Sequence, residues 1–145
     1  MPDISQITTY QAAMIQSIAH RQLGTMKNKI LKDKGLSMMQ WVVLGYVHDS
    51  GEEGTRISEI AEALGTTLAF ITSNVNILES RNFVTKVKHE HDSRARLVSF
   101  RPEQEQQFQK IELEVRDELR KTIYSKVSRE ELNNYVNTLY KFADK

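Results

Sequence analysis

The sequence predicts a mainly helical protein that carries one small β element. With 145 residues, of which 39% are hydrophobic and 27% charged, and with only 2 prolines and 6 glycines, the composition is typical of one packed globular domain. Apolar residues recur with a helical period along most of the chain, and the period changes from 3.6 to 2 in a single stretch, 83–100. These observations favour an α-rich fold with a short pair of strands.

Two helices are predicted before the middle of the chain. From about Ile4 to Leu31 apolar residues recur at steps of three and four, which indicates one long amphipathic helix that Gly35 ends. A second helix begins after Ser37, a residue suited to capping it, and is apolar enough to be the central helix of the domain. The stripe of the first helix consists of Ile15, Ala19, Leu23, Met26 and Ile30.

Two shorter helices follow across a tight turn. ISEIAEAL at 57–64 has helical spacing, Gly65 ends it, and Thr66 or Thr67 can cap a second helix over 68–81. We expect Leu68, Ile71, Val75 and Leu78 to form the inward stripe of this second helix. The arrangement is that of a helix-turn-helix.

A hairpin and two closing helices complete the predicted fold. Alternation and β-branched residues predict strands at 83–91 and 96–100, with HDSRA at 91–95 as the tip of a two-stranded wing. A helix-turn-helix followed by such a hairpin is a winged helix. Pro102 then starts a long amphipathic helix, and Ser128 with Glu131 forms a capping box before the last one. The stripe of the long helix is Phe108, Ile111, Val115, Leu119 and Ile123.

The charge pattern points to the hairpin as a candidate contact with nucleic acid. The whole chain has a net charge of +1, whereas residues 81–101 hold six basic and two acidic residues, a local net charge of +4. The outward side chains at the start of the second short helix include no acid. Hydroxyls there can approach phosphates, an asparagine can pair with adenine, and alanine or phenylalanine can touch a thymine methyl group. We therefore predict DNA binding.

A winged helix can also serve as a protein-interaction module without DNA binding, and this alternative stays open. The two functions differ in their response to salt, because binding to phosphates weakens steeply as salt rises and an apolar protein contact does not.

The sequence resembles the MarR family of winged helix-turn-helix transcriptional regulators over nearly its whole length. The resemblance is carried by LSMMQWVVL at 36–44, SEIAEALG at 58–65, and the DSR motif at 92–94. Where the family often has an arginine this chain has Ser73, and where a glycine usually ends the recognition helix it has Asn82, which can adopt a left-handed conformation at small cost.

The resemblance implies a single MarR-like domain, 1–145, in which residues 36–101 bind double-stranded DNA and helices within 1–35 and 102–145 form a homodimer. Independently, the apolar stripes of the terminal helices are too long to be buried by one winged helix, so a partner surface is expected. The DNA-binding residues that the resemblance implies are Thr66, Thr67, Ala69, Phe70, Thr72, Ser73 and Asn74 on the helix, and Asp92, Arg94 and Arg96 on the wing.

Members of the family commonly repress transcription and release DNA when they bind a small, often aromatic, anion. The resemblance therefore implies a repressor that such an effector releases from DNA. The candidates for lining such an effector site are His20, Met26, Met38, Trp41 and Tyr46, although residues of these types are also ordinary core residues.

Other functions are disfavoured by what the sequence lacks. It has no cysteine, no glycine-rich phosphate loop and no recognisable nucleophile motif, so we expect neither an enzyme nor a thiol switch. His89 and His91 could approach a metal from one face of a strand, but we expect solvated residues and no metal or other cofactor. With no apolar run of about 20 residues and no signal-like start, a cytoplasmic protein without membrane contact is expected.

Overall fold

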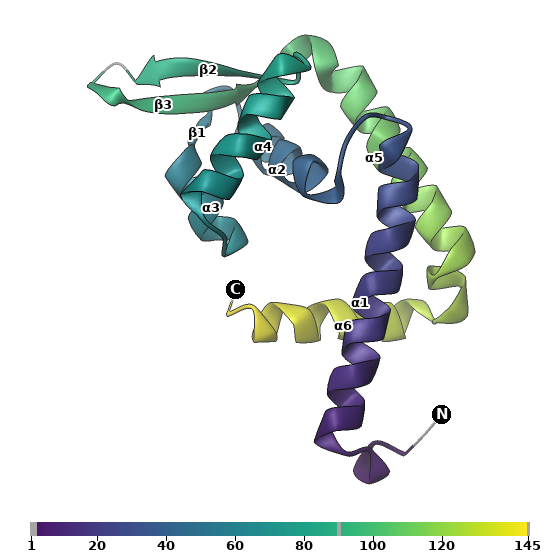
Figure 1. Cartoon of the computed structure of the whole chain (residues 1–145). Coiled ribbons are helices and arrows are strands. Elements are labelled where there is room, and N and C mark those ends of the chain that lie inside the picture. The colour runs from purple at the N-terminus through teal and green to yellow at the C-terminus, as the bar shows by residue number, and fades with distance from the viewer. Residues whose placement is uncertain (1–2, 90, 145) are drawn as a thin grey trace. The chain divides into compact units, whose positions relative to one another are not determined.

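The computed structural model describes residues 3–89 and 91–144, and the side chains of residues 89 and 92–95 lie outside the description. The chain forms two compact units (Figure 1). The helical unit comprises the chain up to Ile30 and from Glu112 onward, and the winged unit spans Leu31–Ile111. The boundaries fall within two long helices. Among the described residues, no helix combines the length and apolar character needed to cross a membrane.

Helices alone make up the helical unit. The expected helix start at Ile4 is wrong, because the chain first makes a 3-10 turn, η1, and α1 begins at Thr9. The predicted capping box is confirmed: the Ser128 hydroxyl accepts from the Glu131 amide at 3.1 Å, and the Glu131 carboxylate accepts from the Ser128 amide at 2.7 Å. The elements are η1 (Ile4–Gln6), α1 (Thr9–Lys32), α5 (Glu105–Thr122), η3 (Tyr124–Lys126) and α6 (Arg129–Phe142).

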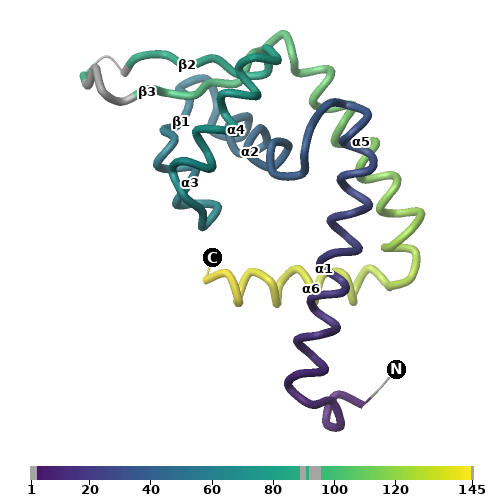
Figure 2. Tube along the Cα trace, in the orientation of Figure 1, coloured from purple at the N-terminus to yellow at the C-terminus, as the bar shows by residue number. Residues whose placement is uncertain are grey.

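The winged unit has the predicted order of helices and strands with one additional strand. β1 pairs antiparallel with β3, which pairs with β2, so the sheet has three strands in the order β1-β3-β2 rather than the two expected. Figure 2 shows β2 and β3 running side by side away from the helices. The elements are α2 (Met38–Asp49), β1 (Thr55–Arg56), α3 (Ile57–Leu64), α4 (Leu68–Ser80), β2 (Val84–His89), β3 (Asp92–Phe100) and the 3-10 turn η2 (Pro102–Gln104).

The centre of the winged unit is α2, as predicted. Its Val43, Leu44 and Val47 are fully buried, and α2 packs against α3, α4 and β3. The helix starts at a capping box in which the Ser37 hydroxyl accepts from the Gln40 amide at 3.1 Å. Each fully buried aliphatic side chain of this kind contributes about 1.5–3 kcal/mol to folding.

Two turns use backbone conformations that the sequence anticipated. Gly35 ends the segment after α1 with φ of 72°. Asn82, which follows α4, has φ of 60°, so the expectation that it would replace a glycine in the left-handed region is confirmed. The amide of the next residue, Phe83, returns to the Leu78 carbonyl at 3.0 Å, and β2 begins directly afterwards.

At Gly54 the loop before β1 lies against the backbone of β3. Its φ is +75°, and a Cβ at this position would lie 2.7 Å from the Val98 carbonyl oxygen and 2.6 Å from the Ser99 hydroxyl. Gly51, in the same loop, has a similar φ of +74° but open space around it. The pairing of β1 with β3 therefore depends on a close backbone approach that only glycine permits.

We predict that Gly54→Ala destabilises the winged unit more than Gly51→Ala. Both changes place an alanine in the left-handed region, which costs about 1–2 kcal/mol. Gly54→Ala also forces the Val98 backbone to move, which adds about 1–3 kcal/mol. Urea denaturation of the two variants and the parent measures the difference, and equal midpoints for both variants would show that the close approach is unimportant.

Candidate nucleic-acid interface

A tight turn sets the start of α4. Gly65 has φ of 62°, its amide donates to Glu62, and the Thr66 amide donates to the Ala61 carbonyl at 3.0 Å, a pair of bonds that satisfies the last carbonyls of α3. Of the two expected caps, Thr67 is the one used, and its hydroxyl accepts from the Phe70 amide at 3.2 Å. The first turn of α4 is thus fixed by local hydrogen bonds before any packing is considered.

The buried face of α4 differs from the predicted one at two positions. It consists of Ile71, Asn74, Val75 and Leu78. Leu68, expected on the inward stripe, is 56% exposed, because it stands at the first position of the helix, beyond the part that packs. The expected outward position of Asn74 is wrong: the residue is only 7% exposed, and its amide group donates to the Phe70 carbonyl at 2.8 Å.

The exposed face of α4 is small, hydroxylated and apolar. Phe70 is 43% exposed, whereas Thr66, before the helix, is only half-buried. Within α4 the single charged residue is Glu79, in the last turn, where its carboxylate lies 3.5 Å from the Lys86 ammonium. No residue in the first turns of α4 is therefore acidic. The exposed residues of this face are Thr67, Leu68, Ala69, Phe70, Thr72, Ser73 and Asn76.

Cations of the hairpin are exposed where its two strands pair. Lys88 and Arg96 are Cα partners in β2 and β3, and both are exposed. Like charges placed directly opposite each other are destabilising in a sheet unless an anion lies near them. By contrast, Lys86 is bound to Glu79 and Asn76, and Arg101 is bound to Glu103 and to the Val84 carbonyl.

The predicted tip of the hairpin is displaced. β2 ends at His89 and β3 begins at Asp92, so 92–95 belong to a strand and not to the turn. The register shifts between Lys88 and His89, an irregularity that lets turn-favouring residues continue a strand. The side chains of Asp92 and Arg94, both expected to act in the wing, lie outside the described residues, as does that of His89.

His48 joins α2 to the start of α5 beneath the hairpin. Its Nε2 lies 2.9 Å from a carboxylate oxygen of Glu105, and its Nδ1 lies 3.1 Å from Asp49. The ring centroid lies 4.9 Å from that of Phe100, at the end of β3, and 4.6 Å from that of Phe108. One half-buried imidazole therefore contacts three elements of the winged unit.

The two carboxylates raise the pKa of His48. Partial burial by itself lowers this pKa, but hydrogen bonds to Asp49 and Glu105, together with their charges, outweigh it. The pKa of Glu105 is lowered, first by a hydrogen bond from the Gln109 side chain and then by His48. The contact therefore stabilises the fold most when the imidazole is charged and the carboxylate ionised.

We predict that the destabilisation caused by His48→Gln depends on pH. Because the pKa of His48 is raised on folding, its contribution is complete below the unfolded pKa of about 6.5 and is lost as pH rises through the folded value. The melting temperature should fall more on substitution at about pH 6 than at about pH 8.5. Glu105→Gln should show the same trend and the double variant should add little, whereas a loss that is constant over pH would contradict the charged contact.

The candidate effector residues are divided between the two units. His20 is exposed and Met26 half-buried on α1, in the helical unit. Met38, Trp41 and Tyr46 are half-buried on α2, in the winged unit.

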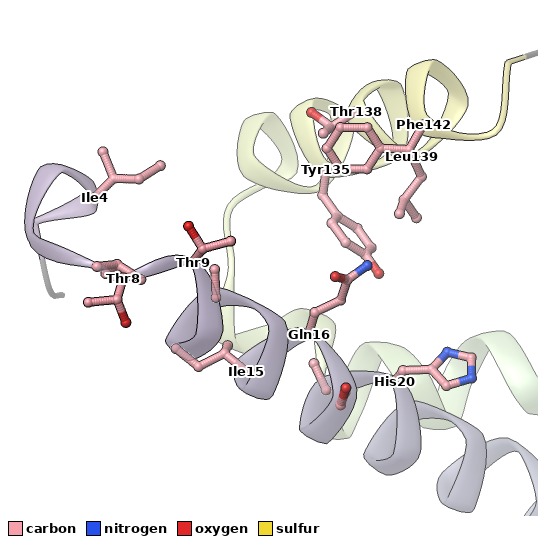
Figure 3. Close-up of a pocket in the computed structure, with 14 residues that line it drawn as sticks. Ile4, Thr8, Thr9, Ile15, Gln16, His20, Tyr135, Thr138, Leu139 and Phe142 are labelled. Atoms are coloured by element: carbon pink, nitrogen blue, oxygen red, sulfur yellow. The ribbon is translucent and has the colours of Figure 1, made fainter.

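The helical unit contains an apolar hollow of about 890 Å³ between α1 and α6. In Figure 3, Tyr135 extends from α6 toward Gln16 on α1, with His20 at one end and Ile4 at the other. Of the fifteen large hydrophobic side chains that are exposed in the described part of the chain, twelve belong to this unit. An apolar surface of this extent is unusual for a lone soluble domain.

Fold and surface together define a winged helix-turn-helix protein, and comparison with known proteins agrees. Residues 34–95 match a family model described as the MarR family. No curated protein matches the chain significantly. The winged helix-turn-helix segment of this chain is therefore similar to the MarR family, and the chain has the fold of the MarR-family regulators among the solved structures.

Three solved structures illustrate the similarity. The first is AbsC, a MarR family transcriptional regulator from Streptomyces coelicolor, with 20% identity over 95% of each chain and a TM-score of 0.77. The second is CouR from Rhodococcus jostii RHA1 bound to p-coumaroyl-CoA, with 20% identity over 95% of each chain and a TM-score of 0.81. The third is MepR of S. aureus in complex with DNA, with 20% identity, coverage of 96% of this chain and 98% of that one, and a TM-score of 0.74.

Proposed function

We propose that the protein is a sequence-specific DNA-binding transcriptional regulator that acts as a homodimer through α4 and the β2–β3 hairpin. The observation that carries the proposal is the exposed, acid-free start of α4, held in place by a buried opposite face. A helix presented in this way suits the major groove, and the adjacent cationic strands suit the phosphate backbone. Selection of bound fragments from random duplex DNA tests it, and enrichment of no sequence would contradict it.

The residues proposed to meet DNA are a revised form of the predicted set. Thr67, Ala69, Phe70, Thr72 and Ser73 remain, because all are exposed on α4. Asn74 leaves the set because its amide is buried and bonded within the helix. Thr66 stays as a candidate phosphate contact at the turn, and the wing contributes Arg96, Lys88 and, from the sequence, Asp92 and Arg94.

The salt dependence of binding distinguishes a phosphate contact from a protein interface. We predict that Arg96→Ala weakens binding across all sequences and lowers the slope of log affinity against log salt by about 1 for each protomer, hence by about 2 for a dimer. Fluorescence anisotropy over a salt series measures the slope. Arg116→Ala on α5, which also removes an exposed arginine, should leave it unchanged. Affinity that is independent of salt would instead favour the protein-interaction module.

The homodimer rests on the apolar surface of the helical unit. Tyr135, Leu139 and Phe142 of α6 line the hollow and are all exposed. A second copy of the same surface is self-complementary under a two-fold axis, the commonest symmetry of soluble oligomers. Two copies would then present two α4 helices to half-sites about one helical turn of DNA apart.

We predict that Leu139→Asp converts the dimer to a monomer at micromolar concentration, because it places a charge in an apolar interface. Light scattering or sedimentation measures the mass. Val87→Asp makes a similar change at an exposed residue of β2 and should leave the dimer intact. A parent protein that is monomeric under these conditions would contradict the assembly.

We extend the proposal to repression that a small aromatic or anionic effector relieves. Support comes from the family resemblance and from CouR, whose structure holds p-coumaroyl-CoA. In this chain His20, Met26, Met38, Trp41 and Tyr46 are the candidate contacts. Titrating aromatic carboxylates and acyl thioesters into the protein–DNA complex tests it, and release of DNA by one of them is the expected result.

A further inference from the structure

We infer that Phe70, together with Ala69, reads the methyl groups of thymine in the major groove. This inference rests on the proposed function and adds the base that α4 recognises. It follows from what the exposed face of the helix offers a base edge and from what it lacks.

The charged and amide side chains of α4 already make contacts within the winged unit. The usual partners of guanine are arginine and lysine, and cytosine is read by carboxylates, yet the one charged residue of α4 is Glu79, which is bound to Lys86 in the last turn. Adenine is usually read by asparagine or glutamine. Of the two asparagines, Asn74 is buried and bonded to Phe70, and Asn76 accepts a hydrogen bond from Lys86.

The hydroxyl groups of the helix discriminate poorly between bases. Thr67 caps the helix by accepting from the Phe70 amide, and the Thr72 hydroxyl donates to the Leu68 carbonyl at 2.8 Å. Ser73 remains exposed, but serine pairs with either donors or acceptors and specifies no base alone. Apolar contact is therefore the most selective interaction with a base that the exposed start of α4 offers.

Phe70 is held in position for such a contact. Its amide donates to Thr67 and its carbonyl accepts from Asn74, at 3.2 Å and 2.8 Å. These bonds fix the backbone on both sides of a side chain that is nevertheless 43% exposed. Contact between an exposed aromatic ring and an apolar group is favourable, because it removes apolar surface from water. The apolar group that the major groove offers is the methyl group of thymine.

The experiment compares thymidine with deoxyuridine, which lacks only that methyl group. A duplex selected from random DNA by the protein is synthesised with thymidine or with deoxyuridine in its half-sites. We expect a loss of affinity of about fourfold for each contacted methyl, which multiplies over two half-sites. Deoxyuridine placed outside the half-sites should have no effect.

Phe70→Ala connects the effect to its residue. This variant should bind the thymine duplex more weakly and show nearly equal affinity for the two duplexes, because the partner of the methyl group is gone. Val87→Ala truncates another exposed apolar side chain and should keep the full thymine preference, whatever it does to total affinity. Circular dichroism of each variant confirms that it is folded.

The outcomes separate the inference from the function on which it rests. Specific, salt-dependent binding with equal affinity for thymine and deoxyuridine would overturn the inference alone. A thymine preference that persists in Phe70→Ala would also overturn it. The absence of any sequence-specific DNA binding would overturn the proposed function and the inference together.

Discussion

The burial of one face of α4 is the constraint on which the rest of the structure depends. Ile71, Val75 and Leu78 are fully buried against the neighbouring helices and the sheet, and Asn74 occupies the same face by bonding its amide to the helix itself. Rotation of the helix about its axis would expose these side chains at a cost of several kcal/mol. The burial of this face therefore determines which residues of α4 face outward. These residues stay exposed without any further interaction among themselves.

Local signals explain most of what could be predicted from the sequence. Ser37 and Ser128 were both predicted as helix caps, and the capping box of Ser128 with Glu131 was recognised without any tertiary information. The structure adds Gln40 as the partner that completes a second box at Ser37. Gly65 and Asn82 were likewise recognised from local sequence, and their left-handed conformations follow from the need to end a helix. The fold class followed because these signals separate successive helices and because Asn82 lies where the hydrophobic period changes from that of a helix to that of a strand.

The mistakes arose where tertiary contacts decide. β1 has two residues, too few for any pattern, and exists because Gly54 lets the chain approach β3. Leu68 and Asn74 were assigned to the wrong faces because periodicity alone does not show where packing begins along a helix, and because a buried asparagine can satisfy itself on a backbone carbonyl. The local charge of +4 was counted over 81–101, a window that includes Lys86 and Arg101 but not the acids that pair with them. These acids, Glu79 and Glu103, lie just outside the window on either side.

The pairing of Lys88 with Arg96 has a consequence for the energetics of the free protein. Two cations held face to face across a ladder repel each other, and mobile anions will gather around them to compensate. Any polyanion that reaches the strands displaces those small ions, with a gain in their entropy, and takes over the neutralisation of the two cations.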